Sequence, residues 1–154
     1  MNAKQLQKAL DRAEQNCRAT GARLTEKRKH ILQLLLQSGT PLSAYELASQ
    51  YHETLGETIP AMSVYRMLDF LVEETLAHKL NSTNKYIACA HITCDHEHEV
   101  PQFLICDRCQ SVKEIGISHT IINALDASVK KAGYVLTQPQ IELHCLCKAC
   151  ANAA

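Results

Sequence analysis

Apolar residues in the first half of the chain recur at intervals of three and four positions, the spacing of amphipathic helices. This pattern predicts helices over residues 3–20 and 26–37, a third helix that starts after Ser43, and a fourth over residues 60–74. Ser43 is followed three positions later by Glu46, the spacing of a capping box, which marks the first turn of the third helix. We therefore expect four successive helices before the chain changes character.

Two short runs with the composition of β-strands follow the fourth predicted helix, at residues 76–80 and 85–89. The tetrapeptide Asn-Ser-Thr-Asn between them is typical of a hairpin turn. Helices two to four followed by such a hairpin make a winged helix-turn-helix domain, which we place at residues 1–90. In that motif one helix enters the major groove of DNA, and residues 60–74 form the predicted recognition helix.

The second half of the chain begins with a polar, histidine-rich segment, residues 91–101, which we interpret as a hinge. The pattern beyond it predicts strands at 103–105, 112–115, 134–137 and 141–146 and a helix at 117–132. The apolar residues of that helix are expected to face inward, and they are Ile121, Ile122, Leu125 and Val129. A module of about 60 residues buries little surface alone, so residues 102–154 need a staple, a dimer partner or both.

Net charge by itself indicates no partner, because the chain has 16 basic and 16 acidic side chains. The basic residues are nevertheless concentrated between positions 18 and 29, where five cations accompany one acidic residue. Such a concentration is what a DNA-binding surface requires. The N-terminus carries charges throughout and is no signal peptide, and no segment reaches the roughly 18 apolar residues of a membrane span. We therefore expect a cytosolic protein with no membrane partner.

The eight cysteines indicate metal binding rather than disulfides, because the cytosol keeps thiols reduced. Four of them form two C-x-x-C pairs, Cys106 with Cys109 and Cys147 with Cys150. Each pair can turn two thiolates toward one ion, and two pairs make the tetrahedral shell that suits structural zinc. The predicted fold class is therefore α+β, with an N-terminal winged helix-turn-helix domain and a C-terminal α/β dimerisation domain that carries a four-cysteine zinc site.

A second set of potential ligands lies mostly around the hinge, and it consists of His78, Cys89, His91, Cys94, His96, His98 and Glu114. A shell of two imidazoles, one thiolate and one carboxylate favours zinc over ions that prefer hard oxygen ligands. Ligands drawn from both domains would let the ion set the angle between them, which makes a switch. Any one histidine alone is more often a solvated surface residue, and Cys94 is open between ligand, bystander and redox-sensitive thiol.

Several motifs resemble those of the ferric uptake regulator family, which joins an N-terminal winged helix to a C-terminal dimerisation domain. Residues 63–68, Ser-Val-Tyr-Arg-Met-Leu, are similar to its T/S-V-Y-R-x-L, and residues 23–28 resemble its R-x-T-x-x-R. The zinc uptake branch is indicated by residues 82–89, 103–109, 112–114 and 141–147. The resemblance covers nearly the whole chain. It implies a zinc-responsive transcriptional repressor of zinc uptake and homeostasis genes, which binds double-stranded operator DNA as a homodimer.

The resemblance also implies the regulatory ligands, one from the wing, one after it, one from the hinge and one beyond the first C-x-x-C. Carried over to this chain, they are His78, Cys89, His98 and Glu114. Together with the structural site, this predicts two Zn²⁺ ions per chain. The segment from Cys89 to Cys106 is slightly longer than in similar proteins, so His96 competes with His98 for the hinge role. Pro139 stands near the place of a further family ligand, so no third full site is expected, and the roles of His144 and Cys145 stay open.

The predicted DNA contacts are Arg66, Tyr65, Tyr45, Arg23, Lys27 and Arg28. Arg66 on the recognition helix can read guanine through two hydrogen bonds, whereas Tyr65 either packs or touches a thymine methyl group or a phosphate. Tyr45 resembles a family position that approaches the duplex, and the alternative is a partly buried core tyrosine. Arg23, Lys27 and Arg28 are expected to bind phosphates, the alternative being an ordinary solvated helix face.

Three other functions are alternatives to this prediction. A zinc deaminase would need an H-x-E followed by P-C-x-x-C, and neither signature occurs, nor does an H-E-x-x-H, a nucleophile elbow or a P-loop. We therefore expect no catalytic residues and no small-molecule substrate. A zinc-stabilised protein-interaction adaptor without DNA binding is a second alternative, against which the basic segment and Tyr65-Arg66 argue. An iron- or peroxide-sensing member of the same family is the third, and Cys89 argues against it.

Overall fold

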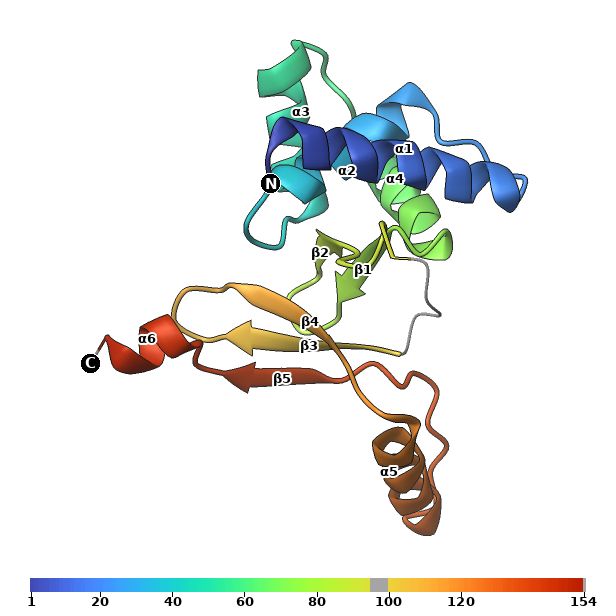
Figure 1. Ribbon diagram of the computed structural model, residues 1–154, viewed down its shortest axis with the longest axis vertical. Coiled ribbons are helices and arrows are strands. Elements are labelled where there is room, and N and C mark those ends of the chain that lie inside the picture. Colours follow the sequence, from blue (N-terminus) through green and yellow to red (C-terminus); the bar gives the residue numbers. More distant parts are fainter. Residues whose placement is uncertain (95–99, 154) are drawn as a thin grey trace. The chain divides into compact units, whose positions relative to one another are not determined.

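The computed structural model describes residues 1–94 and 100–153. The chain divides into two compact units, Met1–Cys94 and Asp95–Ala154 (Figure 1). The first contains α1 (Ala3–Ala19), α2 (Glu26–Gln37), α3 (Ala44–Leu55), α4 (Ala61–Glu73), β1 (Ala77–Leu80) and β2 (Lys85–Ala88). The second contains β3 (Pro101–Cys106), β4 (Val112–Gly116), α5 (His119–Lys131), β5 (Glu142–Cys145) and α6 (Lys148–Asn152). No helix in these described ranges combines the length and the apolar character that crossing a bilayer requires.

Side-chain caps start the first three helices of the N-terminal unit. Asn2 and Ser43 each form a capping box, with Gln5 on α1 and Glu46 on α3 respectively. The Thr25 side chain accepts a hydrogen bond from the Arg28 N–H at the start of α2. These caps satisfy backbone N–H groups that have no partner inside their helices. The capping signals in the sequence therefore mark real helix starts, including the one predicted at Ser43.

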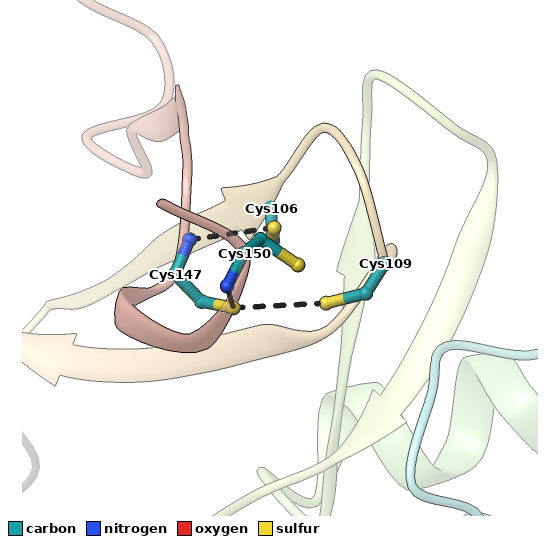
Figure 2. Close-up of side chains that lie close together, drawn as sticks. All are labelled: Cys106, Cys109, Cys147 and Cys150. Carbon is teal, nitrogen blue, oxygen red and sulfur yellow. Dashed lines mark hydrogen bonds between the residues drawn. The ribbon is translucent and has the colours of Figure 1, made fainter. Parts of the chain in front are cut away.

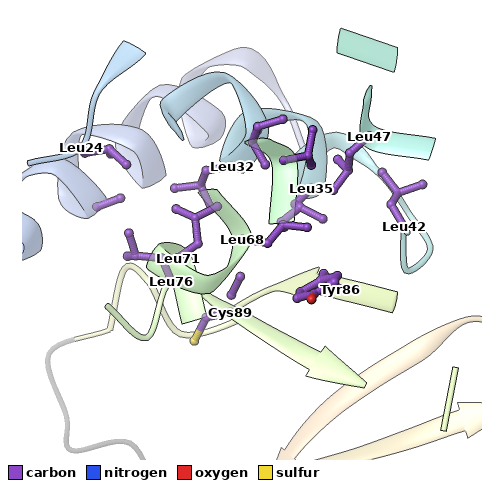
Figure 3. Close-up of a cluster of buried hydrophobic side chains, with 14 of the residues drawn as sticks. Leu24, Leu32, Leu35, Leu42, Leu47, Leu68, Leu71, Leu76, Tyr86 and Cys89 are labelled. Atoms are coloured by element: carbon purple, nitrogen blue, oxygen red, sulfur yellow. The ribbon is translucent and has the colours of Figure 1, made fainter. Parts of the chain in front are cut away.

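The core of the N-terminal unit is a cluster of leucine side chains from α2, α3 and α4 (Figure 3). Leu32, Leu47, Leu68 and Leu71 are completely buried in it. Tyr86 from β2 is also buried and belongs to the same cluster. The burial of these side chains removes apolar surface from water, which is the main favourable contribution to folding of such a small unit.

The wing is the antiparallel pair β1 and β2, in which His78 lies opposite Ile87 and Leu80 lies opposite Lys85. Asn84 in the connecting turn has a positive φ of 51°, a conformation that asparagine tolerates better than most residues. Leu42, from the segment before α3, exchanges backbone hydrogen bonds with Tyr86 and attaches the wing to the helices. The predicted winged helix-turn-helix is confirmed.

The C-terminal unit is built on a three-stranded sheet with the order β4-β3-β5. β3 pairs antiparallel with β4 and parallel with β5, and α5 lies between β4 and β5 in the chain. Gln102 on β3 is completely buried. Its side chain donates a hydrogen bond to the Pro139 carbonyl at 3.0 Å and accepts one from the Ile141 N–H at 2.5 Å. This amide therefore holds the segment before β5 in place.

The second unit differs from the sequence prediction in three elements. Residues 134–137 form no strand, and α6 was not predicted. No residue of α5 is buried within the chain, although four apolar residues were expected to face inward. Ile121 is 55% exposed and Leu125 36% exposed. The expectation was wrong for the single chain because α5 projects away from its own sheet (Figure 1).

Candidate functional site

The four cysteines of the two C-x-x-C pairs come together at one end of the β4-β3-β5 sheet (Figure 2). Cys106 ends β3, and Cys109 follows it in a tight turn before β4. Cys147 is the N-cap of α6, and Cys150 lies within that helix. The parallel pairing of β3 with β5 aligns Cys106 with Cys145, so both C-x-x-C pairs lie at the same end of the sheet.

The spacing of the sulfur atoms fits a zinc ion. All four Sγ atoms lie within 4.8 Å of one another, and those of Cys109 and Cys147 are 3.8 Å apart. A tetrahedral ion with Zn–S bonds of about 2.3 Å requires sulfur–sulfur separations of about 3.8 Å. The four cysteines form no disulfide. Cys106, Cys109, Cys147 and Cys150 are therefore a suitable closed shell for structural zinc.

Hydrogen bonds lower the pKa of two of these thiols, Cys106 and Cys109, and raise the pKa of a third, Cys150. The N–H groups of Cys109 and Cys147 lower the pKa of Cys106 to about 6, and the Cys147 N–H lies 3.3 Å from the Cys106 sulfur. The Ser111 hydroxyl, 3.0 Å from the Cys109 sulfur, lowers the pKa of Cys109. The interaction with Cys147 raises the pKa of Cys150 to about 12. Without a cation, the cluster therefore retains at least one proton at neutral pH.

His78 and Cys89 form a second group of potential ligands within the N-terminal unit. His78 lies on β1, and Cys89 follows β2, where its N–H donates to the Leu76 carbonyl at 2.9 Å. This antiparallel register brings the thiol and an imidazole nitrogen within 4.8 Å of each other. Cys89 is buried, and its sulfur accepts a hydrogen bond from the His91 N–H at 3.4 Å. A thiolate and an imidazole at this separation suit zinc.

The remaining predicted regulatory ligands belong to the other unit or to the hinge. Glu114 is half-buried on β4, opposite Phe103 of β3. His96 and His98 lie outside the described residues. His91 and Cys94 are both half-buried in a turn closed by a hydrogen bond from the Cys94 N–H to the His91 carbonyl.

The predicted base-reading residues share one region of the N-terminal unit. Arg66 is exposed on α4, and Tyr65 beside it is half-buried. The rings of Tyr45 and Tyr65 meet edge to face, with centroids 6.4 Å apart and planes at 88°. Tyr45 is 69% exposed, so it is not the core tyrosine that the sequence left as an alternative. Its ring is therefore held by Tyr65 while most of its surface stays accessible.

Met62 joins Arg66 on the exposed face of α4, which the sequence analysis missed. Methionine is an apolar residue, but the side chain of Met62 is 66% exposed. Met62, Arg66 and Asp69 are all exposed, at the i, i+4, i+7 spacing of one helix face. That spacing was present in the sequence. It is difficult to recognise there because methionine is an apolar residue type, which is more often buried than exposed.

The basic segment is less uniformly cationic than its sequence indicates, because acidic residues from elsewhere pair with it. Lys27 forms an ion pair with Glu57, which raises the pKa of Lys27 through a hydrogen bond. Glu14 of α1 pairs with Arg18 at 2.5 Å and lies 3.5 Å from Lys29. Of the residues predicted to bind phosphate, Arg23 is exposed and Arg28 is half-buried.

Comparison with known proteins identifies the family of this chain. The family model described as the ferric uptake regulator family matches residues 19–151. The chain belongs to the ferric uptake regulator family.

Several members of the ferric uptake regulator family are similar to this chain over almost its whole length. The zinc uptake regulation protein of Escherichia coli (strain K12) is 37% identical over 144 residues, which cover 94% of this chain and 82% of that protein. A solved zinc uptake regulator in complex with zinc and DNA is 33% identical, with a TM-score of 0.82 and 96% of each chain covered. The holo form of XcZur is 37% identical, with a TM-score of 0.78 and coverage of 94% of this chain and 97% of that one.

The ferric uptake regulation protein of Helicobacter pylori is a more distant member of the family. It is 27% identical over 145 residues, which cover 94% of this chain and 93% of that protein. The zinc uptake regulation protein of Escherichia coli is thus more similar in sequence than this iron-related member.

Proposed function

We propose that this protein is a zinc-responsive, DNA-binding transcriptional repressor that controls zinc uptake and homeostasis genes. It acts as a homodimer on double-stranded operator DNA. The observation that carries this conclusion is the pairing of a thiol with an imidazole at Cys89 and His78, in a winged-helix chain that is 37% identical to a zinc uptake regulation protein. A transcription regulator of this family needs no catalytic residues and no small-molecule substrate.

The structural ion is held by Cys106, Cys109, Cys147 and Cys150 in this proposal. The spacing of their sulfur atoms supports it. Zinc there joins the end of β3 to the start of α6 and stabilises a unit whose helix α5 buries no residue within the chain. Binding free energy at such a site is folding free energy, so the ion contributes directly to the stability of the unit.

The regulatory ion is held by His78, Cys89, His98 and Glu114. The separation of less than 4.8 Å between the ligand atoms of His78 and Cys89 supports two of these ligands. The carboxylate of Glu114 and one hinge histidine complete a shell of two imidazoles, one thiolate and one carboxylate, which suits zinc. His96 is the alternative hinge ligand. Because these ligands come from both sides of the hinge, zinc would select one arrangement of the DNA-binding units.

DNA recognition is assigned to α4 and the residues around it. Arg66 reads a guanine, and the exposed ring of Tyr45, supported by Tyr65, touches a base edge or the backbone. Arg23 and Lys27 bind phosphates, and Lys27 exchanges its partner Glu57 for a phosphate when DNA arrives. Arg28 contributes to the same surface while it also holds α2 against α4. The exposed apolar residues of α5 support a dimer interface in the C-terminal unit.

A zinc titration of DNA binding tests the proposal. The probe is a DNA duplex selected from a random pool by the zinc-loaded wild-type protein, and binding is followed by fluorescence anisotropy in a zinc buffer. We expect wild-type affinity to rise with free zinc and the Cys89→Ser protein to show no zinc response while it stays dimeric. Cys145→Ser removes a thiol that belongs to neither group of potential ligands, so it serves as the matched variant and should keep the zinc response.

The same titration separates the alternatives. A wild-type curve for Cys89→Ser would place the sensor elsewhere, and a protein that selects no duplex at any zinc concentration would be an adaptor. An iron- or peroxide-sensing member would respond to ferrous ion rather than to zinc. We expect His98→Ala to weaken the zinc response more than His96→Ala, which ranks the two hinge histidines.

A further inference from the structure

The two residues between Cys106 and Cys109 both reach across to the segment that carries the second cysteine pair. The Oδ1 atom of Asp107 lies 2.8 Å from Nδ1 of His144 on β5. The Nη1 atom of Arg108 donates to the carbonyl oxygen of Cys150 at 2.6 Å and to that of Ala153 at 3.1 Å. The residues between the two cysteines of the first C-x-x-C therefore also contact the segment that carries the second pair.

The carbonyl groups that Arg108 contacts lie in and just after α6, a helix of five residues. The last carbonyl groups of a helix have no partner inside it, and a cation there is favourable because it opposes the helix dipole. Isolated helices of this length do not form in water, so α6 depends on contacts from outside itself. Arg108 is the side chain that supplies such contacts at the C-terminal end of α6 in the described structure.

The conformation of α6 decides where two of the four sulfur atoms point. Cys147 is the N-cap of this helix, and its sulfur accepts a hydrogen bond from the Cys150 N–H at 3.5 Å. Cys150 lies one turn further on, within the helix. If α6 unwinds, both thiols lose their direction toward Cys106 and Cys109.

We propose that Arg108 is a positioning residue that holds α6, and with it Cys147 and Cys150, in the metal-binding conformation before zinc arrives. The inference rests on the proposed four-cysteine zinc site. In this role the Arg108 side chain acts on α6, whereas the hydrogen bond from the Arg108 backbone N–H to the Cys106 sulfur is a separate contact that a side-chain substitution retains. Because α6 is already held in place, it loses less conformational entropy when zinc binds. The ion therefore binds more tightly and dissociates more slowly.

Arginine suits this role better than lysine because one planar guanidinium group presents several N–H donors in a fixed arrangement. A single Nη1 atom satisfies two carbonyl groups here. Partners outside the ligand shell typically change metal affinity by about ten- to a hundredfold when they are removed. Because Arg108 is exposed, we expect the lower end of this range.

Metal release from the full-length protein tests the proposal. Four proteins are loaded with Co²⁺, whose thiolate charge-transfer absorption reports on the sulfur shell, and release into excess chelator is timed. They are the wild type, Arg108→Met, Arg108→Lys and Lys113→Met, the last of which removes a cation from exposed Lys113 on β4. The regulatory ligands are unchanged in all four proteins, so differences in the cobalt–thiolate signal arise at the four-cysteine site.

We expect Arg108→Met to release cobalt about tenfold faster than the wild type, Arg108→Lys to give an intermediate rate, and Lys113→Met to match the wild type. A contact that only stabilises the fold would lower the unfolding midpoint and leave the release rate of the folded protein unchanged. Wild-type release from Arg108→Met, or equal acceleration by Lys113→Met, would overturn the proposal. If Arg108→Met does not fold, a wild-type rate for Arg108→Lys overturns it equally. A wild-type protein without a four-thiolate cobalt spectrum would instead refute the zinc site itself.

Discussion

The guanidinium group of Arg28 lies over the ring of Phe70, with its central carbon 3.7 Å from the ring centroid. The same group donates a hydrogen bond to the carbonyl oxygen of Arg23 at 2.8 Å. Arg28 therefore joins three parts of the N-terminal unit, which are α2, the loop before it and the helix α4 that carries Arg66. A side chain predicted to bind phosphate therefore also packs on α4, the predicted recognition helix.

Replacing Arg28 by methionine should lower both stability and DNA affinity. The loss of the contact with Phe70 and of the hydrogen bond to Arg23 should reduce the free energy of unfolding by about 1–2 kcal/mol. Urea denaturation monitored by circular dichroism measures this change. Arg23→Met is the matched variant, because Arg23 is exposed and should act on phosphates alone. It should keep wild-type stability and reduce the salt slope of DNA binding by about one. Equal stability of the two variants would show that the Arg28 contacts contribute nothing.

Loss of one structural ligand should unfold the C-terminal unit. In Cys106→Ser or Cys150→Ser, we expect one zinc fewer per chain and an aggregated or disordered second unit, because a three-cysteine site binds poorly and the ion contributes folding free energy. Metal analysis by mass spectrometry and sedimentation measure both effects. Cys145→Ser is the control, since the Cys145 thiol donates to the backbone carbonyl of Ile105 and lies outside the four-cysteine shell. A folded, dimeric and fully metallated Cys106→Ser protein would contradict the assignment.

Zinc binding at the four-cysteine site should release fewer than four protons per ion at pH 8. Cys106, with a pKa of about 6, is already ionised at that pH, whereas Cys150, with a pKa of about 12, still carries its proton and must lose it. As pH falls through 6, the proton of Cys106 must also be displaced, so release rises and apparent affinity falls. Calorimetry in buffers with different ionisation enthalpies counts the protons. Release that does not change between pH 8 and pH 5.5 would exclude this order of ionisation.

Charges placed on α5 should dissociate the dimer. Ile121 and Leu125 are exposed apolar residues in the chain, and a partner that covers them would remove their surface from water. Ile121→Glu combined with Leu125→Glu should raise the dissociation constant of the dimer at least about a hundredfold, because burial would then require desolvation of two carboxylates. Analytical ultracentrifugation with zinc present measures this. Asn123→Gln combined with Ala127→Gln, at exposed positions on the opposite side of α5, is the control and should leave the dimer intact.

Local sequence signals were sufficient for most of the N-terminal unit. The predicted and observed limits of α2 coincide at Glu26 and Gln37, because the cap at Thr25 and the apolar period are properties of neighbouring residues. The start of α3 after Ser43 was recovered for the same reason. The helix α6 was missed because five residues carry too little periodicity, and its end is held by Arg108 from a distant turn.

The candidate metal ligands were recognised from residue type and spacing, but their proximity depends on strand pairing. Cys106 and Cys147 approach each other because β3 and β5 run parallel, with α5 between β4 and β5 in the chain. No local pattern specifies that pairing. The proximity of His78 to Cys89 likewise follows from the register of β1 and β2, in which a shift of one residue would turn His78 to the opposite face.

The sequence by itself determined the chemistry available to this protein, because C-x-x-C pairs, a wing histidine and a basic segment are properties of short stretches of chain. Only the tertiary structure decided which of the basic side chains already form an ion pair with an acidic side chain of the protein. Lys27 and Lys29 are paired with Glu57 and Glu14, acids that lie far from them in the chain and reach them only when the helices pack. The exposure of Met62 and of α5 was also decided there, since burial depends on what another part of the molecule covers.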